Sequence, residues 1–239
     1  MGLNDECARR IVLDIETVAL DDAGEYIPGP VQVDPPDLTT ITAAKNLTDP
    51  AKIAASLAQR TAAAMTEYEE QHAKAQAHYQ KALADAALDP DLCRIVAIGW
   101  ARGVDAQVWT LSEELEIDGL QAFWSRVGQS SFLGFNILVF DLPVLIRRSQ
   151  YLGVSYPALN LDRYRTPHVD LMQVLSFRGA QKFRSLDFYA KRFKIGIADP
   201  VSGKDIAGLV QAGNWEAVRA HCQADLAKTR LLAQRLGLL

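Results

Sequence analysis

The sequence has little cysteine and no cysteine pairs. Its three cysteines, Cys7, Cys93 and Cys222, lie far apart along the 239-residue chain. Zinc knuckles and disulfide scaffolds need cysteines at short, paired spacings, so the sequence argues against both. Scattered cysteines are typical of proteins from a reducing compartment, and we therefore expect a cytoplasmic protein.

Long apolar runs are also absent. No segment is long enough and apolar enough to cross a membrane, so we expect no membrane partner. The first ten residues, MGLNDECARR, carry charges with no apolar run behind them and do not resemble a signal peptide. The hydrophobic fraction of 49% is nevertheless large enough to build a folded core.

The chain lacks an overall excess of positive charge. It has 25 lysines and arginines against 29 acids, a net charge of -4, whereas proteins that coat nucleic acid through bulk charge are usually basic. The charge is uneven, however. Residues 1–30 hold seven acids and two bases, and residues 147–194 hold ten bases and three acids. This asymmetry is compatible with an enzyme that grips nucleic acid through a local patch.

The pattern of apolar residues predicts an α/β fold. Short apolar or β-branched runs indicate strands, at 10–17, 94–101, 107–111, 131–136 and 169–171. Amphipathic spacing indicates helices, at 113–127, 141–150, 185–193 and 214–236 and in a short segment that ends near Phe177. Ser112, Ser185 and Asn214 are the expected N-caps. This order of elements indicates a mixed sheet with helices on both faces.

One segment interrupts the pattern. Residues 51–88 contain neither proline nor glycine, and their thin, alanine-rich apolar stripe has helical spacing. We expect one long helix or a helical hairpin that Pro90 ends, and either a solvated spacer or a substrate clamp is compatible with it. With 51–88 as an insertion, the rest of the chain fits one domain, so we expect a single domain over residues 1–239.

Asp14 and Glu16 lie in the first expected strand. Side chains two residues apart on a strand point to the same face, so both carboxylates project together among apolar neighbours. Two anions in such a setting are costly unless something neutralises them, and oxygen ligands suit Mg²⁺ or Mn²⁺. Taken alone, the pair is better explained as a strand end in solvent.

Two further polar groups are ambiguous when taken singly. Asp141 begins a helix shortly after the strand that ends at Asn136, where an N-cap and a turn residue are the simple explanations. His221 and Asp225 are four positions apart on the last helix and share one face, as in many surface hydrogen bonds. No second histidine or paired cysteine is placed to complete a zinc site.

Together, the three segments resemble the DEDD superfamily of 3′–5′ exonucleases. Leu13–Thr17 resembles the first motif, Gly134–Asp141 the second and His221–Asp225 the third. The chain is similar in particular to the predicted exonucleases related to the proofreading domain of family-B DNA polymerases, a group that includes stand-alone phage and bacterial proteins. The resemblance covers nearly the whole chain. It implies a ribonuclease H-like fold with a mixed five-stranded sheet, helices on both faces and the 51–88 insertion after the first strand.

The same resemblance implies a two-metal mechanism. Asp14, Glu16, Asp141 and Asp225 would hold two divalent ions, Mg²⁺ or Mn²⁺, that lie about 3.5–4 Å apart and clamp an in-line displacement at phosphorus. Asp14 is the expected bridge between the two ions. His221 is the expected general base, which takes or orients the proton of the attacking water. These five residues are the expected catalytic set.

His221 departs from the pattern of the family. The third motif carries either a tyrosine with three residues between it and the aspartate, or a histidine with four. His221 has three residues before Asp225, which is the tyrosine spacing. A shift by one residue turns a helical side chain by about 100°. We still expect His221 to be the base, because imidazole titrates near neutral pH and phenol does not.

A second group of residues is expected to bind the substrate. Thr17 and Asn136 would contact the terminal nucleotide, and Phe140 would stack on a base, although core packing is its simpler role. The basic stretch 147–194 would track the nucleic-acid backbone. Its best candidates precede a capped helix and are Arg178, Lys182 and Arg184.

The expected substrate is the 3′ end of DNA, in single-stranded form, with nucleoside monophosphates as products. An exoribonuclease of the same fold and a non-catalytic nucleic-acid-binding module are the alternatives. Retention of all four acids argues against the non-catalytic module. Because no polymerase segment follows the third motif, we expect any polymerase, replication or repair partner to act in trans.

Overall fold

The computed structural model of the chain describes residues 10–239. Cys7 and the N-terminal segment considered for a signal peptide lie outside the described residues. Within the described part of the chain, none of the helices combines the length and the apolar character that a membrane span requires. The described residues up to Leu20 form one compact unit with Ala86–Leu239, and Asp21–Asp85 forms a second.

The first unit is built on a mixed five-stranded sheet with the strand order β3-β2-β1-β4-β5. Strand β1 is Ile11–Ala19, β2 is Cys93–Arg102 and β3 is Asp105–Thr110, and these three are antiparallel. The short strands β4, Phe132–Gly134, and β5, Val169–Asp170, extend the sheet in parallel from β1. The central strand β1 carries a bulge between Glu16 and Thr17.

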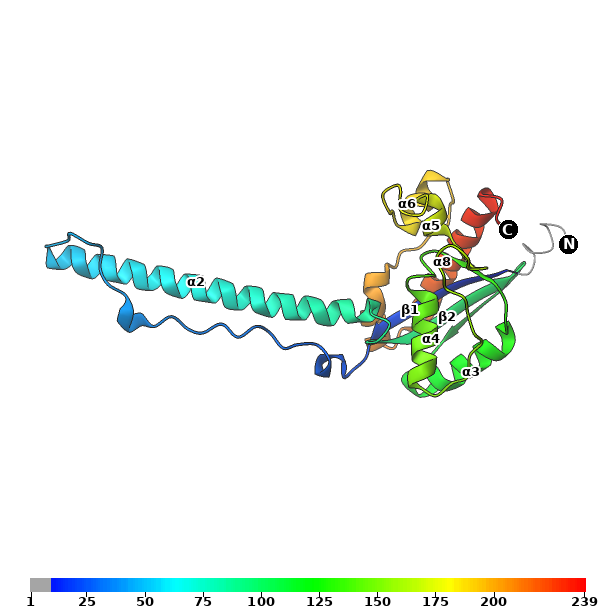
Figure 1. The fold of residues 1–239 in the computed structure, drawn as a ribbon, viewed down its shortest axis with the longest axis horizontal. Helices are drawn as coiled ribbons and strands as arrows, with labels where there is room; N and C mark the ends of the chain where they lie inside the picture. Colours follow the sequence, from blue (N-terminus) through cyan, green and yellow to red (C-terminus); the bar gives the residue numbers. More distant parts are fainter. Residues whose placement is uncertain (1–9) are drawn as a thin grey trace. The chain divides into compact units, whose positions relative to one another are not determined.

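Alternate side chains of β1 enter two different cores. Ile11, Leu13 and Ile15 pack against helices α3, Glu116–Val127, and α4, Asp141–Tyr151. Val12 and Val18 pack on the opposite face, which is covered by helix α8, Trp215–Arg235. Because the side chains of a strand alternate, Asp14 and Glu16 belong to the α8 face. The predicted α/β fold, a mixed five-stranded sheet with helices on both faces, is confirmed (Figure 1).

Three shorter helices complete this unit: α5, Leu171–Leu175, α6, Leu186–Arg192, and α7, Ile206–Gln211. Ser185 and Asn214 cap α6 and α8 as predicted, since each side chain accepts a hydrogen bond from a backbone N–H of the first turn. Ser112 is at the expected N-cap position, but it precedes a 3₁₀ turn, Glu113–Leu115, that leads into α3, and its side chain makes no capping hydrogen bond. Helix α7 was not expected from the sequence.

The second unit contains helix α2, Pro50–Asp85, which has 36 residues and no buried side chain. It is a single helix rather than a hairpin, and a 3₁₀ turn, Ala86–Leu88, follows it in the chain. Hydrogen bonds join α2 to the extended segment before it, from the Ala44 N–H to Ser56 and from Arg60 to the Thr42 carbonyl.

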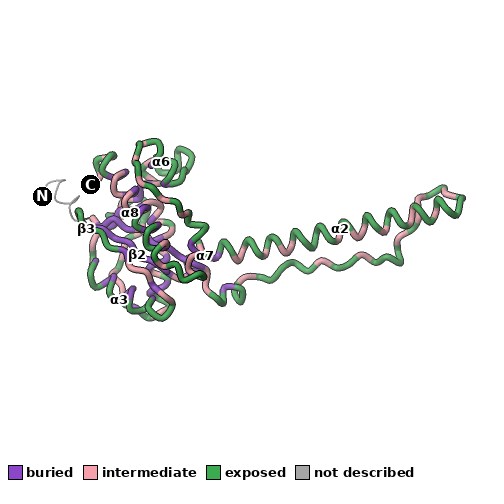
Figure 2. The backbone as a smooth tube through the Cα atoms, turned by 180° about the vertical axis from the view of Figure 1, so that it is seen from behind, coloured by how far each residue is buried: buried purple, intermediate pink, exposed green. Residues whose placement is uncertain are grey.

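The buried residues gather around the sheet (Figure 2). The single domain expected over 1–239 stays a prediction.

Candidate active site

The first acidic pair lies at the middle of the sheet. Asp14 and Glu16 project from β1 toward α8, and the bulge that follows Glu16 locally disrupts the pairing of β1 with β2. Glu16 is buried, and Asp14 is half-buried. Among residues 10–239, the Asp14 Oδ2 atom is inaccessible to solvent and has no hydrogen-bond partner. An inaccessible carboxylate oxygen without a partner is costly, which makes this atom a candidate metal ligand.

Asp141 joins this pair from the neighbouring helix. It is buried at the first position of α4, and its Oδ1 accepts a hydrogen bond of 3.1 Å from the backbone N–H of Ile15. That bond attaches the start of α4 to β1 between Asp14 and Glu16. The N-cap position belongs to Phe140, so the simple capping role considered for Asp141 does not apply.

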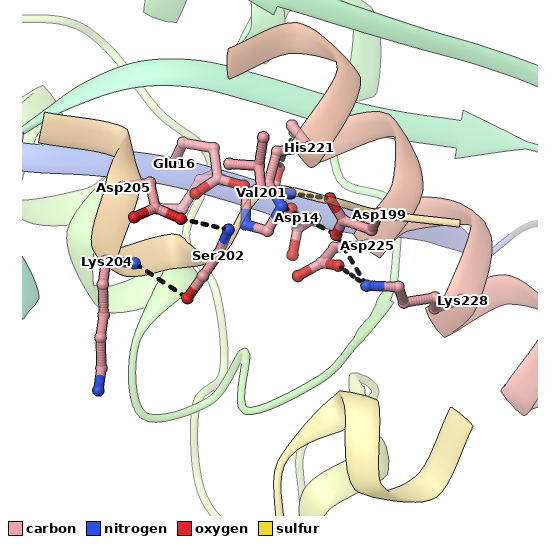
Figure 3. A network of polar contacts seen from close by, with 12 residues as sticks. Asp14, Glu16, Asp199, Val201, Ser202, Lys204, Asp205, His221, Asp225 and Lys228 are labelled. Carbon is pink, nitrogen blue, oxygen red and sulfur yellow. Dashed lines mark hydrogen bonds and ion pairs between the residues drawn. The ribbon is translucent and has the colours of Figure 1, made fainter. Parts of the chain in front are cut away.

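Helix α8 brings His221 and Asp225 to the same place (Figure 3). The imidazole of His221 is buried, and its Nε2 lies 3.7 Å from Glu16 Oε1. Its other nitrogen, Nδ1, lies 2.9 Å from Asp199 Oδ2. The tyrosine-type spacing therefore does place His221 against the acids of β1.

Two residues of this network were missed by the sequence reasoning. Asp199 lies in an irregular segment after α6, and no sequence pattern marks it. Lys228 is buried on α8, and its Nζ lies 2.8 Å from one carboxylate oxygen each of Asp187, Asp199 and Asp225. The spacing of Asp225 and Lys228 on one helix is the single signal that could have suggested this ion pair.

The four clustered acids of β1, α4 and α8 ionise less readily than free carboxyl groups do. Burial raises the pKa of Asp14 and of Glu16 well above their usual values, and repulsion from the neighbouring carboxylates adds to the effect. Burial also raises the pKa of Asp141 to about 7, and it raises the pKa of Asp225. A cation bound between these groups would reverse this tendency, because it stabilises the ionised forms.

Asp199 and Lys228 behave in the opposite way. Burial disfavours the charge on Asp199, but hydrogen bonds from Lys228 and His221 outweigh it and hold the pKa of Asp199 below its usual value. Burial likewise disfavours the Lys228 ammonium, but its carboxylate partners raise the pKa of Lys228. Asp199 is therefore a stable anion, and its His221 partner donates from Nδ1.

Two groups of side chains could hold a metal ion by distance alone among the described residues. Ligand atoms of Asp14, Glu16 and Cys222 lie within 4.8 Å of one another, as do those of Asp199, His221 and Asp225. In the second group Lys228 already supplies a cation to both aspartates. In the first, burial raises the pKa of the Cys222 thiol well above its usual value, so that the two carboxylates are the better ligands.

Comparison with known proteins assigns the family. Residues 87–239 match the family described as predicted 3′–5′ exonucleases related to the exonuclease domain of PolB. The chain belongs to this exonuclease family. The matched range contains Asp141, His221 and Asp225, whereas Asp14 and Glu16 precede it, so it is the fold that joins the two sets. No curated protein matches the chain.

Among solved structures, this exonuclease-family chain is similar to the family B DNA polymerase from the hyperthermophilic archaeon Pyrobaculum calidifontis. The two share 20% sequence identity, with a TM-score of 0.49. The similarity covers 62% of this chain and 22% of the polymerase chain.

The three motif residues expected at the substrate have structural partners. Thr17 is buried, and its hydroxyl donates a hydrogen bond of 2.6 Å to the Ala87 carbonyl. Asn136 adopts a left-handed turn conformation with φ of 65°, and its backbone N–H donates to Asp170. Phe140 is half-buried and packs against the core beneath α4. Asp170 also caps α5, so its role is structural.

The basic residues expected to meet the substrate divide into two groups. Arg178, Lys182 and Arg184 are exposed in the segment before α6. Arg148 is different: it is buried and makes two hydrogen bonds of 2.8 and 2.7 Å with Glu116. The expectation that Arg148 tracks the nucleic-acid backbone is therefore wrong, because its guanidinium is used inside the protein to pair α3 with α4.

Proposed function

We propose that this exonuclease-family chain is a metal-dependent enzyme that hydrolyses phosphodiester bonds from the 3′ end of single-stranded DNA and releases nucleoside monophosphates. The observation that carries the proposal is the convergence of four carboxylates from three elements. They are Asp14 and Glu16 of β1, Asp141 of α4 and Asp225 of α8. Without metal ions such a group destabilises the fold, because burial and repulsion oppose its ionisation and, of the four, only Asp225 is bonded to Lys228.

These four carboxylates would hold two divalent ions, Mg²⁺ or Mn²⁺. Their oxygens are the hard ligands that such ions prefer. Asp14 Oδ2 accepts no hydrogen bond from any described residue, so it remains available to a metal ion. When bound, the ions would lower the pKa of a water molecule and stabilise the charge on the oxygens at phosphorus. Asp14 would be the residue shared by both ions.

His221 is the proposed general base. With its Nδ1 proton donated to Asp199, the lone pair of Nε2 is free on the side that faces Glu16. From this position the imidazole can accept the proton of a water molecule that attacks phosphorus. Asp199 stabilises the imidazolium that forms and holds the ring in one orientation.

Substrate contacts would come from two sides. Asn136, in the motif that ends at Asp141, and the peptide group of Thr17, which follows Glu16, are the proposed contacts of the terminal nucleotide. Phe140 would offer its exposed part to a base. Arg178, Lys182 and Arg184 would bind phosphates, since their charges are exposed. We propose that residues 1–239 act as one exonuclease domain.

Oligonucleotide hydrolysis tests this proposal. The purified protein should release mononucleotides from a 3′-labelled DNA strand with Mg²⁺ or Mn²⁺, and Asp14→Ala should abolish the release. Asp105→Ala, which removes an exposed acid of β3, is the matched control and should retain activity. An RNA strand of the same sequence should be degraded more slowly. Absence of hydrolysis of both strands by the wild-type protein would refute the proposal, and faster RNA cleavage would make the chain an exoribonuclease.

A further inference from the structure

The segment around the loop from Phe177 to Arg184 exposes large aromatic rings. Four rings are exposed to solvent by 40 to 72%: Tyr164, Phe177, Phe183 and Phe188. A soluble protein rarely leaves several large rings uncovered in one region unless they bind something. None of the four rings belongs to the three exonuclease motifs, so the proposed catalytic groups do not account for them.

The rings alternate with positive charges. Arg178 stacks over Tyr164 with its Cζ 5.5 Å from the ring centroid, and Arg184 lies in the same way 5.0 Å from Phe188. Exposed Arg163 and Lys182 add two more cations. Of the acids between residues 162 and 188, Asp170 is buried and Asp187 is bound to Lys228. Asp162 and Asp187 are exposed acids, but the four exposed cations outnumber them, so the surface is positive.

The loop that carries this surface is held in place from beneath. Phe177, Arg178 and Gly179 all have left-handed φ angles, of 52°, 58° and 88°, which turn the chain outward. The buried Ser176 supports them, since its carbonyl accepts hydrogen bonds from the N–H groups of Gly179 and Gln181. Arg163 donates to the Arg178 carbonyl from the neighbouring segment. Phe177 and Phe183 are therefore presented by a fixed loop, which reduces the entropy lost on binding.

The surface is connected to the candidate active site in two ways. Asp187 of α6 bonds to Lys228, which in turn bonds to Asp225. In addition, the Phe188 ring contacts Tyr189 with 5.3 Å between centroids, and Tyr189 lies 6.2 Å from Phe135 of the second motif. A strand with its 3′ end at the acids could therefore continue over these rings.

We propose that this aromatic and basic surface, formed by Tyr164, Phe177, Phe183 and Phe188 with the four cations between them, binds single-stranded nucleic acid upstream of the 3′ end. Single strands present phosphates and open base faces together, whereas a duplex hides its base faces in the stack. The proposal deepens the proposed function and rests on it for the direction of the strand. It selects single strands over duplexes.

Binding without hydrolysis tests the proposal. In EDTA, the affinity for an oligothymidylate of about 16 nucleotides should fall about 5- to 100-fold in Phe177→Ala and in Tyr164→Ala, because each loses a stacking ring. The dependence of affinity on salt should not change in these variants. Tyr26→Ala removes a ring of similar exposure, 65%, outside this surface and should bind like the wild type.

Charge variants give the complementary result. Lys182→Gln should lower the slope of log affinity against log salt by about 0.7, since one phosphate contact is lost. Arg126→Gln removes an arginine that stacks on Trp109 elsewhere in the fold and should leave the slope unchanged. Phe177→Trp keeps the stacking ring, so it should bind as tightly as the wild type, and its fluorescence should be quenched by the oligonucleotide.

The outcomes separate the two proposals. Wild-type affinity in both aromatic variants, or equal affinity of the protein for the single strand and its duplex, would overturn the binding surface. Unquenched Phe177→Trp fluorescence in the bound complex would do the same. Hydrolysis of the p-nitrophenyl ester of thymidine 5′-phosphate by the wild-type protein tests the exonuclease chemistry on a substrate with a single base. If the wild-type protein binds the oligonucleotide but does not hydrolyse this ester, the proposed exonuclease function is refuted and the proposed binding surface still stands.

Discussion

Asp199 Oδ2 lies 2.9 Å from His221 Nδ1, and both side chains are buried. The two residues come from an irregular segment and from α8, and they are 22 positions apart. The Lys228 ammonium lies 2.8 Å from the same Asp199 oxygen and favours the ionised carboxylate, which can only accept hydrogen bonds, so the proton of this contact is on His221 Nδ1. The contact therefore selects the tautomer whose Nε2 can act as a base.

Asp199→Asn should lower the rate of hydrolysis by about 10- to 1000-fold, since a neutral amide no longer selects the tautomer or stabilises the imidazolium. The same change should have no further effect in a His221→Ala background. The tautomer itself can be read from the ring nitrogen shifts of His221 in NMR spectra, as the chain has four histidines. An equal loss of rate in both backgrounds, with an unchanged tautomer, would contradict the role of Asp199.

Lys228→Met should destabilise the protein by about 3–5 kcal/mol. The change removes a buried ammonium, 5% exposed, and leaves Asp199 and Asp225 without their cation. Urea unfolding followed by circular dichroism measures the loss. Lys81→Met is the matched control, because Lys81 and Asp85 are a solvent-exposed pair on α2 and water replaces their contact. We expect no measurable change there, and similar losses in the two variants would argue against the buried network.

Asp14→Asn should raise the melting temperature of the metal-free protein, because it removes one of the mutually repelling buried charges. The wild type should gain stability when Mn²⁺ is added, by about 2.7 kcal/mol at a hundredfold excess over the dissociation constant. The variant should lose most of this gain. Melting curves in EDTA and in Mn²⁺ give both results, and Asp118→Asn, on the surface of α3, serves as the control. An undiminished Mn²⁺ effect in Asp14→Asn would remove Asp14 from the ligand set.

We expect buried His168 to make the protein less stable in mild acid. Burial lowers the pKa of His168 from 6.5 to about 4, and its Nδ1 accepts a hydrogen bond from the Phe132 N–H. The folded state thus binds fewer protons than the unfolded state between these values. The contribution of neutral His168 to the free energy of unfolding is complete above about pH 6.5 and is lost as the pH falls toward 4. The total is about 3 kcal/mol.

The variant His168→Asn checks this assignment, because its amide oxygen can replace Nδ1 as the acceptor without titrating. Unfolding free energies of metal-free protein should therefore fall less steeply with acidification in the variant than in the wild type. Parallel curves would show that other groups cause the acid sensitivity.

Much of the fold could be predicted because its signals are local. The alternation of β1 and the caps at Ser185 and Asn214 are written in neighbouring residues, and the strands and helices formed within a few residues of their expected ranges. Helix α7 was missed because it is short, and the capping box of Ser202 and Asp205 belongs to the 3₁₀ turn, Gly203–Asp205, that precedes it. Ser112 is the N-cap residue as predicted, but the helical segment begins with a 3₁₀ turn and the Ser112 side chain makes no capping hydrogen bond.

Arg147 and Arg148 show where local reasoning fails. Both belong to the same basic stretch, but Arg147 is half exposed and pairs with Asp91, whereas Arg148 is buried against Glu116. The difference arises from which face of α4 packs on α3. A count of charges along the chain cannot distinguish two such residues.

The sequence by itself determined most of the elements and the face of β1 that carries Asp14 and Glu16, because alternation and capping depend on residues a few positions apart. Only the tertiary structure decided which groups surround them. Asp199 meets His221, and Lys228 meets three carboxylates, because α8 packs on the sheet beside the segment that follows α6. Such contacts arise from the packing of distant segments, and no local pattern records them.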